Sequence, residues 1–270
     1  MDRFDWLEID DEIAATQSAQ KEAPVRPQDG PTFAKAARRM RESGHFRSAV
    51  QFYEKALGFQ PHDYACWVEM IDTLLRARQL EAADEKSQAA LGDRGQVRVL
   101  YASRALVLAH QGQYREAQQH LEAAQDTTEP AWYAACVEAE LLLRQDPTQR
   151  GPALACLERA ADATKARWDV HFLAGWMLLD AKLPALAAGH FAEAGHWNPH
   201  APLGWLCLGD CFQDLRLYDQ AMFYYQRVTE LEPGHALGLK RQKQCGGRMY
   251  GLLRVFRREN LRRRWNEEFE

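Results

Sequence analysis

The stretch PLGWLCLGDCFQDLRLYDQAMFYYQRVTELEPGH, residues 202–235, decides the fold of this chain. Large and small apolar residues recur in it three or four positions apart, with a break before Tyr218, and this is the period of an amphipathic helix. Pro233 ends the second pattern, because proline does not continue a helix. The stretch therefore predicts two helices joined by a short turn. The residues that carry the pattern are Trp205, Leu208, Gly209, Phe212, Tyr218, Ala221, Tyr225 and Val228.

The same pattern recurs along the whole chain. Three ladders of small residues repeat at intervals of 34 residues, with one interval of 36 in each ladder. Small residues in phase let neighbouring helices approach closely, as stacked helical hairpins require. The sequence thus predicts an all-α chain of repeated helix pairs. The ladders are Ala49, Ala83, Ala117, Ala153, Ala187 and Ala221; Ala56, Ala90, Ala124, Ala160, Ala194 and Val228; and Ala37, Ile71, Ala105, Ala139, Gly175 and Gly209.

The repeated unit resembles the tetratricopeptide repeat, a 34-residue helix-turn-helix motif with large, small and aromatic residues at fixed positions. The fourth unit is degenerate, with two extra residues in the turn at 146–152. The resemblance implies a right-handed superhelical solenoid of antiparallel helix pairs. It also implies a concave groove that is lined by the first helix of each pair and holds peptides or partner proteins. The six units in phase are residues 30–63, 64–97, 98–131, 132–167, 168–201 and 202–235.

The bulk composition is that of an ordinary helical protein. The 270 residues are 46% hydrophobic and 27% charged, and the net charge of -4 gives no global attraction to nucleic acid or acidic lipid. The first residues lack the basic and apolar regions of a signal peptide, and no run of about 18 apolar residues occurs. The six cysteines lie mostly at helical positions, which favours reduced thiols over a disulfide framework. We expect a soluble, cytoplasmic protein.

The family's groove positions are carried over to this sequence by the resemblance. In the first unit they fall on Arg38 and Arg41. The later groove is aromatic with carboxylates, which suits an amphipathic helix or an extended segment with apolar anchors and some Lys or Arg. The alternative is that Phe172 and Trp176 pack under an adjacent helix or a terminal segment. The predicted partner-binding residues are Val68, Asp72, Ala102, Leu106, Tyr133, Cys136, Glu140, Phe172, Trp176, Leu206 and Asp210.

The two ends of the chain carry opposite charge. We expect residues 1–29 to form an acidic, flexible tail, in which Phe4, Trp6 and Leu7 are either incidental aromatics or a short motif that orders on a partner. Residues 236–270 are expected to form a basic capping helix and tail, because an array must cover its last apolar edge. The sharper alternatives are that arginines of this segment bind nucleic acid or acidic lipid, or pair with the acidic tail. These arginines are Arg257, Arg258, Arg262, Arg263 and Arg264.

The sequence offers little for catalysis. It contains no glycine-rich phosphate loop, Gly-x-Ser-x-Gly, His-Glu-x-x-His or Cys-x-x-Cys motif, so we expect neither an enzyme nor a cofactor. The leading hypothesis is a cytoplasmic adaptor or scaffold that binds a peptide or partner protein in the groove. The alternatives are a chaperone for an apolar segment of a secreted or assembling client, and a phosphate binder that works through the C-terminal arginines. Self-association remains open.

Some members of the family bind the C-terminal carboxylate of chaperones through a set of residues called the carboxylate clamp. With the six units divided as above, this set is absent from the sequence. That clamp uses Lys and Asn in its first unit, Asn in its second, and Lys and Arg in its third. Its positions are held here by Ala34, Arg38, Glu69, Val99 and Ser103.

Overall fold

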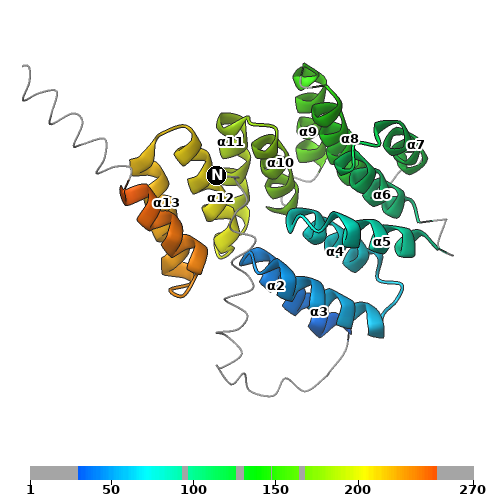
Figure 1. The fold of residues 1–270 in the computed structure, drawn as a ribbon, viewed down its shortest axis with the longest axis horizontal. Helices are drawn as coiled ribbons and strands as arrows, with labels where there is room; N and C mark the ends of the chain where they lie inside the picture. The colour runs from blue at the N-terminus through cyan, green and yellow to red at the C-terminus, as the bar shows by residue number, and fades with distance from the viewer. Residues whose placement is uncertain (1–29, 93–96, 126–130, 147, 164–167, 248–270) are drawn as a thin grey trace, which may run out of the picture.

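The computed structural model describes residues 30–92, 97–125, 131–146, 148–163 and 168–247. Over these residues the chain is helical and contains no strand, so the all-α prediction is confirmed. Consecutive helices form antiparallel pairs, and each pair stacks on the next as a solenoid (Figure 1). No helix in the described ranges is both long and apolar enough to cross a membrane.

The pairs are in step with the repeated sequence pattern. The first helices of the pairs are α2 (Gly30–Glu42), α4 (Tyr64–Arg76), α6 (Arg98–His110), α8 (Ala131–Gln145), α10 (Trp168–Asp180) and α12 (Pro202–Asp214). The second helices are α3 (Phe46–Phe59), α5 (Leu80–Leu91), α7 (Tyr114–Gln125), α9 (Arg150–Ala163), α11 (Pro184–Trp197) and α13 (Tyr218–Leu231). A further helical segment begins at residue 236 and covers the rest of the described chain to residue 247.

Small residues lie where the two helices of a pair cross. A Cβ atom on Gly175 would lie 2.9 Å from Cδ1 of Phe191, and one on Gly209 would lie 2.5 Å from Cε1 of Tyr225. Both distances are shorter than carbon atoms tolerate, so the aromatic ring of the second helix fills the place of the missing side chain. The alanine ladder that begins at Ala49 is fully buried throughout. The periodic small residues therefore set how closely the helices pack.

The turn between the two helices of a pair uses a left-handed residue. Gly44 and Gly112 have φ angles of 81° and 78°, and Arg78, Lys182 and Arg216 occupy equivalent positions with φ angles of 57°, 64° and 62°. At each site the next amide donates to a carbonyl five residues back, as Leu217 N–H does to Phe212 over 2.8 Å. This geometry closes the C-terminus of the first helix and reverses the chain.

The solenoid curves so far that its first pair lies beside its last. In Figure 1 the end of α2 approaches α12, and these two helices are in contact. Phe46 of α3 packs its ring against Trp176 of α10, with centroids 6.3 Å apart. In the turn after α2, His45 Nε2 lies 3.2 Å from Glu232 Oε1. Contacts between distant repeats therefore close the inner face of the array.

The segment from residue 236 packs on the last helix pair. Arg241 forms an ion pair with Asp210 of α12 at 3.1 Å, and the Cys245 thiol donates to the carbonyl of Tyr218 at 3.2 Å. Leu237 and Cys245 are buried. Residues 236–247 thus pack on the end of the array, whereas the basic capping helix over residues 236–270 stays a prediction, because residues 248–270 lie outside the described residues.

Candidate functional site

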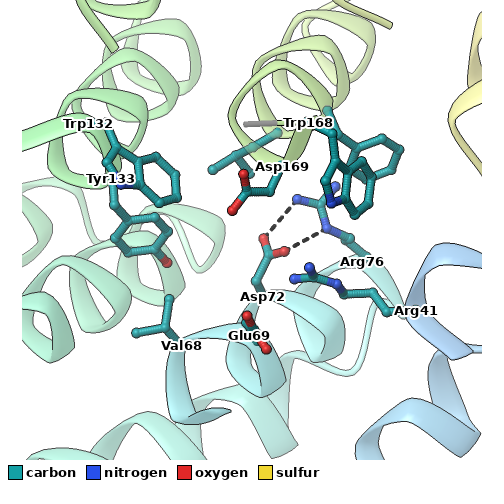
Figure 2. Close-up of a pocket in the computed structure, with 11 residues that line it drawn as sticks. Arg41, Val68, Glu69, Asp72, Arg76, Trp132, Tyr133, Trp168 and Asp169 are labelled. Atoms are coloured by element: carbon teal, nitrogen blue, oxygen red, sulfur yellow. Dashed lines mark hydrogen bonds and ion pairs between the residues drawn. The ribbon is translucent and has the colours of Figure 1, made fainter. Parts of the chain in front are cut away.

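An aromatic pocket lies between the first helices of four pairs, α2, α4, α8 and α10 (Figure 2). It encloses about 420 Å³ of empty space, including solvent at its mouth. Aromatic and charged side chains make up most of its wall. We call this site the aromatic pocket, and its lining residues are Arg41, Val68, Glu69, Asp72, Arg76, Trp132, Tyr133, Trp168, Asp169, Phe172 and Leu173.

Helical spacing brings these side chains together. Val68, Asp72 and Arg76 are four residues apart on α4, so they share one face of that helix. Trp168 and Phe172 are one turn apart on α10, and their ring centroids are 5.2 Å apart. The pocket thus combines a polar wall from α4 with an aromatic wall from α10, and the start of α8 supplies the opposite side.

The Arg76 guanidinium is held in one orientation. Its Nε and Nη2 donate to the two carboxylate oxygens of Asp72, over 2.8 and 2.9 Å. Its central carbon lies 5.0 Å from the ring centroid of Phe172 and 4.9 Å from that of Trp176, which adds cation–π attraction. The side chain is 4% exposed. Its remaining nitrogen, Nη1, is buried and makes no hydrogen bond within the described chain.

Arg41 reaches the pocket from the end of α2. Its guanidinium lies 5.8 Å from the ring centroid of Trp168. Among the residues that the structure describes, the Arg41 side chain forms no hydrogen bond or ion pair, and its Nε is buried. Burial lowers the pKa of Arg41, but Tyr53 and nearby carboxylates outweigh this and raise the pKa above its ordinary value. Arg41 is therefore a charged donor whose hydrogen-bonding capacity is unused.

The other charges at the pocket have partners of their own. Glu69 accepts from Nε of Arg38 at 2.8 Å through one carboxylate oxygen and at 3.1 Å through the other. Asp169, in the first turn of α10, accepts from the backbone N–H of Val170 over 3.2 Å. Because Asp72 is bound to Arg76, each of these three carboxylates already accepts a hydrogen bond. The groups of the two pocket arginines that make no hydrogen bond are donors, Nε of Arg41 and Nη1 of Arg76.

A second polar cluster lies deeper between the first helices. Glu140 of α8 is buried, and its Oε1 lies 2.7 Å from both His110 Nε2 and Arg144 Nε. Arg144 also pairs with Asp180 at 2.6 Å, and Arg78 pairs with the same carboxylate at 2.9 Å. Burial alone would raise the pKa of Glu140, but His110 and Arg144 lower it far below its ordinary value. The cluster ties several repeats together through buried charge.

The predicted groove residues are placed in different environments. Val68, Asp72, Tyr133 and Phe172 line the aromatic pocket. Glu140 belongs to the buried polar cluster, and Asp210 pairs with Arg241. Trp176 lies over the Arg76 guanidinium and packs edge-on against Phe46. Four further predicted groove residues are buried, each at most 2% exposed: Ala102, Leu106, Cys136 and Leu206.

Partner contact by these residues stays a prediction. Phe172 also packs against Phe191 of α11, with ring centroids 5.6 Å apart, and Trp176 packs against Phe46 of α3. The sequence pattern also indicates eight residues in the terminal segments, and all of them lie outside the described residues. They are Phe4, Trp6, Leu7 and the arginines at 257, 258, 262, 263 and 264.

The sequence pattern did not assign several pocket residues to a site. Trp132 and Trp168 entered the sequence pattern only as the first residues of the fourth and fifth units. Two tryptophans at equivalent positions of consecutive units are the signal that was available. Arg76 and Asp169 carried no such signal, because single charges on helices are usually solvated.

The comparison with protein families agrees with the helix pairs described above. The family model described as tetratricopeptide repeat matches residues 204–235. The search of curated protein sequences gives no match to this chain. The fold and the inner-face site define a helical-repeat protein of the solenoid class. The matched residues belong to α12 and α13, and the other helix pairs are in phase with this tetratricopeptide-repeat match.

The solved structures that are similar to this chain share little sequence with it. The human IFIT1 dimer with m7Gppp-AAAA has 15% identity and a TM-score of 0.52, over 83% of this chain and 55% of that chain. A tetratricopeptide repeat protein from Parabacteroides merdae has 12% identity and a TM-score of 0.49, over 90% and 93% of the two chains. YrrB, described as having an unusual peptide-binding site, has 19% identity and a TM-score of 0.42, over 71% and 97%.

Proposed function

We propose that this chain is a protein-interaction scaffold that binds a peptide segment of its partner in the aromatic pocket. The observation that carries the proposal is the pocket itself, a recess of four aromatic side chains with charged donors at fixed positions. Concave, mostly apolar sites with a few oriented polar groups are typical of ligand-binding sites. We retain the six-unit division of residues 30–235, the acidic tail and the basic cap as part of this proposal.

Closure of the inner face favours a short peptide over a long client segment. A chaperone groove must receive an extended apolar strip along several repeats. Here Leu106, Cys136 and Leu206 are buried against neighbouring helices, so a strip has no continuous apolar surface to lie on. The chaperone alternative therefore receives less support than recognition at one pocket.

A nucleic-acid ligand is the second candidate, since IFIT1 structures hold capped RNA. The pocket has aromatic rings on which a base can stack. However, Glu69, Asp72 and Asp169 line the same space, and their carboxylates repel phosphate groups. A peptide with at most one negative charge at this point agrees better with the lining.

Selection from a library of random short peptides tests the proposed function. The wild-type chain is compared with Trp168→Leu, which removes a pocket wall, and with the matched control Trp197→Leu. Trp197 is 42% exposed on α11 and does not line the pocket. We expect a peptide family enriched by the wild type and by Trp197→Leu but not by Trp168→Leu. Equal enrichment by all three proteins, or none by any, contradicts the proposal.

A further inference from the structure

We infer that the aromatic pocket binds an acidic side chain, Asp or Glu, that stands next to an aromatic or large apolar residue in the partner peptide. This inference rests on the proposed function and specifies its ligand. It assigns the carboxylate to Arg41 and Arg76, and the apolar neighbour to the rings of the pocket.

The unused hydrogen-bonding groups select an acceptor as ligand. Nε of Arg41 and Nη1 of Arg76 are both buried without a hydrogen bond in the described chain. Buried donors in folded proteins are almost always satisfied, and a charged donor left without an acceptor is costly. Figure 2 shows the two guanidinium groups on the same side of Asp72, with that of Arg76 nearer to Trp168. A ligand carboxylate that reaches both groups gives each arginine an acceptor.

The carboxylates already at the pocket favour a ligand with one negative charge over a ligand with two. Glu69 is engaged by Arg38, and Asp72 is engaged by Arg76. Arg41 remains as a cation that no described carboxylate pairs with. A side-chain carboxylate carries one charge and matches one guanidinium. A phosphate monoester carries nearly two and would lie beside three carboxylates, so it is the poorer match.

The aromatic rings of the pocket can hold a second side chain of the ligand, next to its acidic residue. Trp132 and Tyr133 lie on one side of the pocket and Trp168 on the other, with the charged groups between them (Figure 2). Phe172 completes the apolar wall, packed on Trp168. An aromatic or large apolar residue placed between these rings gains buried area and ring stacking. Recognition of the acid and of its neighbour is therefore coupled in one site.

Fluorescence polarisation with two defined peptides tests the inference. The probe is a fluorescein-labelled peptide with the sequence Gly-Glu-Trp-Leu-Gly, and the matched control peptide replaces its Glu by Gln. The full chain is used as wild type, as Arg41→Met, which keeps the aliphatic stem, and as Arg41→Lys, which keeps the charge. Arg39→Met is the control variant, because Arg39 is exposed on the same helix and does not line the pocket. Circular dichroism confirms that each variant is folded.

We expect the Glu peptide to bind wild type and Arg39→Met equally, and to bind Arg41→Met about ten- to hundredfold more weakly. The Gln peptide should lose a similar factor against wild type, and Arg41→Lys should lie between the two. The inference is overturned if the Glu peptide fails to bind wild type, if Gln substitutes for Glu without loss, or if Arg41→Met binds normally. Binding of a single-stranded RNA oligonucleotide through Arg41, in place of the Glu peptide, overturns it as well.

The two proposals fail in different ways. If library selection yields peptides that depend on Trp168 but lack acidic residues, the scaffold function stands and the inferred ligand is wrong. If no selected peptide depends on Trp168, the scaffold function at this pocket fails, and the inferred ligand fails with it.

Discussion

His235 donates a hydrogen bond through Nε2 to the backbone carbonyl oxygen of Ser43 over 2.9 Å, although 192 residues separate them. The bond joins the turn after α13 to the turn after α2. The N–H of Gly238 donates to Nδ1 of the same ring over 3.0 Å, which fixes the neutral tautomer. Beside it, His45 lies 3.2 Å from Glu232. The first and last repeats are thus connected by histidines.

This connection predicts that acid opens the solenoid. Burial lowers the pKa of His235, and the carbonyl of Ser43 offsets this only in part. The closed form therefore favours the neutral ring, so its advantage is complete above the ordinary His pKa of about 6.5 and declines as the pH falls below it. The pKa of Glu232 is lowered by its bond to His45, so the contribution of this carboxylate to closure is complete above its ordinary pKa of 4.5 and declines as the pH falls below that value. Small-angle scattering should give a larger radius of gyration at about pH 5.5 than at about pH 7.5.

Two variants of His235 separate this effect from the other histidines. His235→Gln keeps an amide donor and does not titrate, so its radius of gyration should change less with pH than that of the wild type. His235→Phe loses both hydrogen bonds and should be open at either pH. A wild-type radius that is the same at both pH values, or a pH response retained in full by His235→Gln, would show that this ring does not control closure.

The buried polar cluster predicts a large effect at Glu140. Glu140→Gln removes the charge that His110 and Arg144 both contact at 2.7 Å. Loss of one partner leaves a buried cation uncompensated, which typically costs about 3–5 kcal/mol. Urea denaturation should show this decrease in the free energy of unfolding. Glu122→Gln is the matched control, since Glu122 is exposed on α7 and should change stability by less than about 0.5 kcal/mol.

Glu140 also predicts a pH dependence of stability. Here folding favours the charged form of the side chain, whereas at His235 it favours the neutral form. The pKa of Glu140 is lowered in the folded chain, so its contribution to stability is complete above the ordinary Glu pKa of about 4.3 and is lost as the pH falls below that value. Between about pH 4.5 and pH 3 the wild type should lose more stability than Glu140→Gln. Parallel losses in the two proteins would place the acid sensitivity elsewhere.

The left-handed turn residues predict a stabilising substitution. Arg216 has a φ of 62°, a conformation that costs a residue with a side chain about 1 kcal/mol relative to glycine. Arg216→Gly should therefore raise the free energy of unfolding by about 0.5–1 kcal/mol. The reciprocal change Gly112→Ala should lower it by about 1 kcal/mol, although a Cβ at Gly112 meets no atom within 4 Å. Thermal melts that move in the same direction for both variants would contradict this explanation.

The repeat was predictable because it depends on local spacing. Ala221 and Tyr225 recur in phase with their counterparts in other units, and the helix pairs follow from that period. The degenerate fourth unit still forms its pair, because its extra residues fall in a turn. The start of each first helix lies at, or within one residue of, the predicted start of its unit. Local pattern and local packing agree throughout the array.

The contact between the first and last repeats and the aromatic pocket were not predictable from local spacing. They depend on the small rotation between successive repeats, which accumulates along the solenoid and brings distant units together. Ser43, Glu232 and His235 lie outside the motif positions, so the period says nothing about their contacts. Arg41 was assigned to the groove, but its lack of a carboxylate partner depends on how α2 meets α10. Polar pairing between distant repeats is a property of the folded array.

The close approach of α12 and α13 predicts a destabilising substitution at Gly209. An alanine Cβ would lie 2.5 Å from the ring of Tyr225, which is fully buried and donates to Asp210 over 2.7 Å. Because the ring is fixed at both ends, Gly209→Ala should lower the free energy of unfolding by about 1–3 kcal/mol. Gly189→Ala is the control, since that helical glycine has open space around it and should gain about 0.5–1 kcal/mol. Equal stability of the two variants in urea would mean that the helices separate readily, and that the phased glycine does not set their distance.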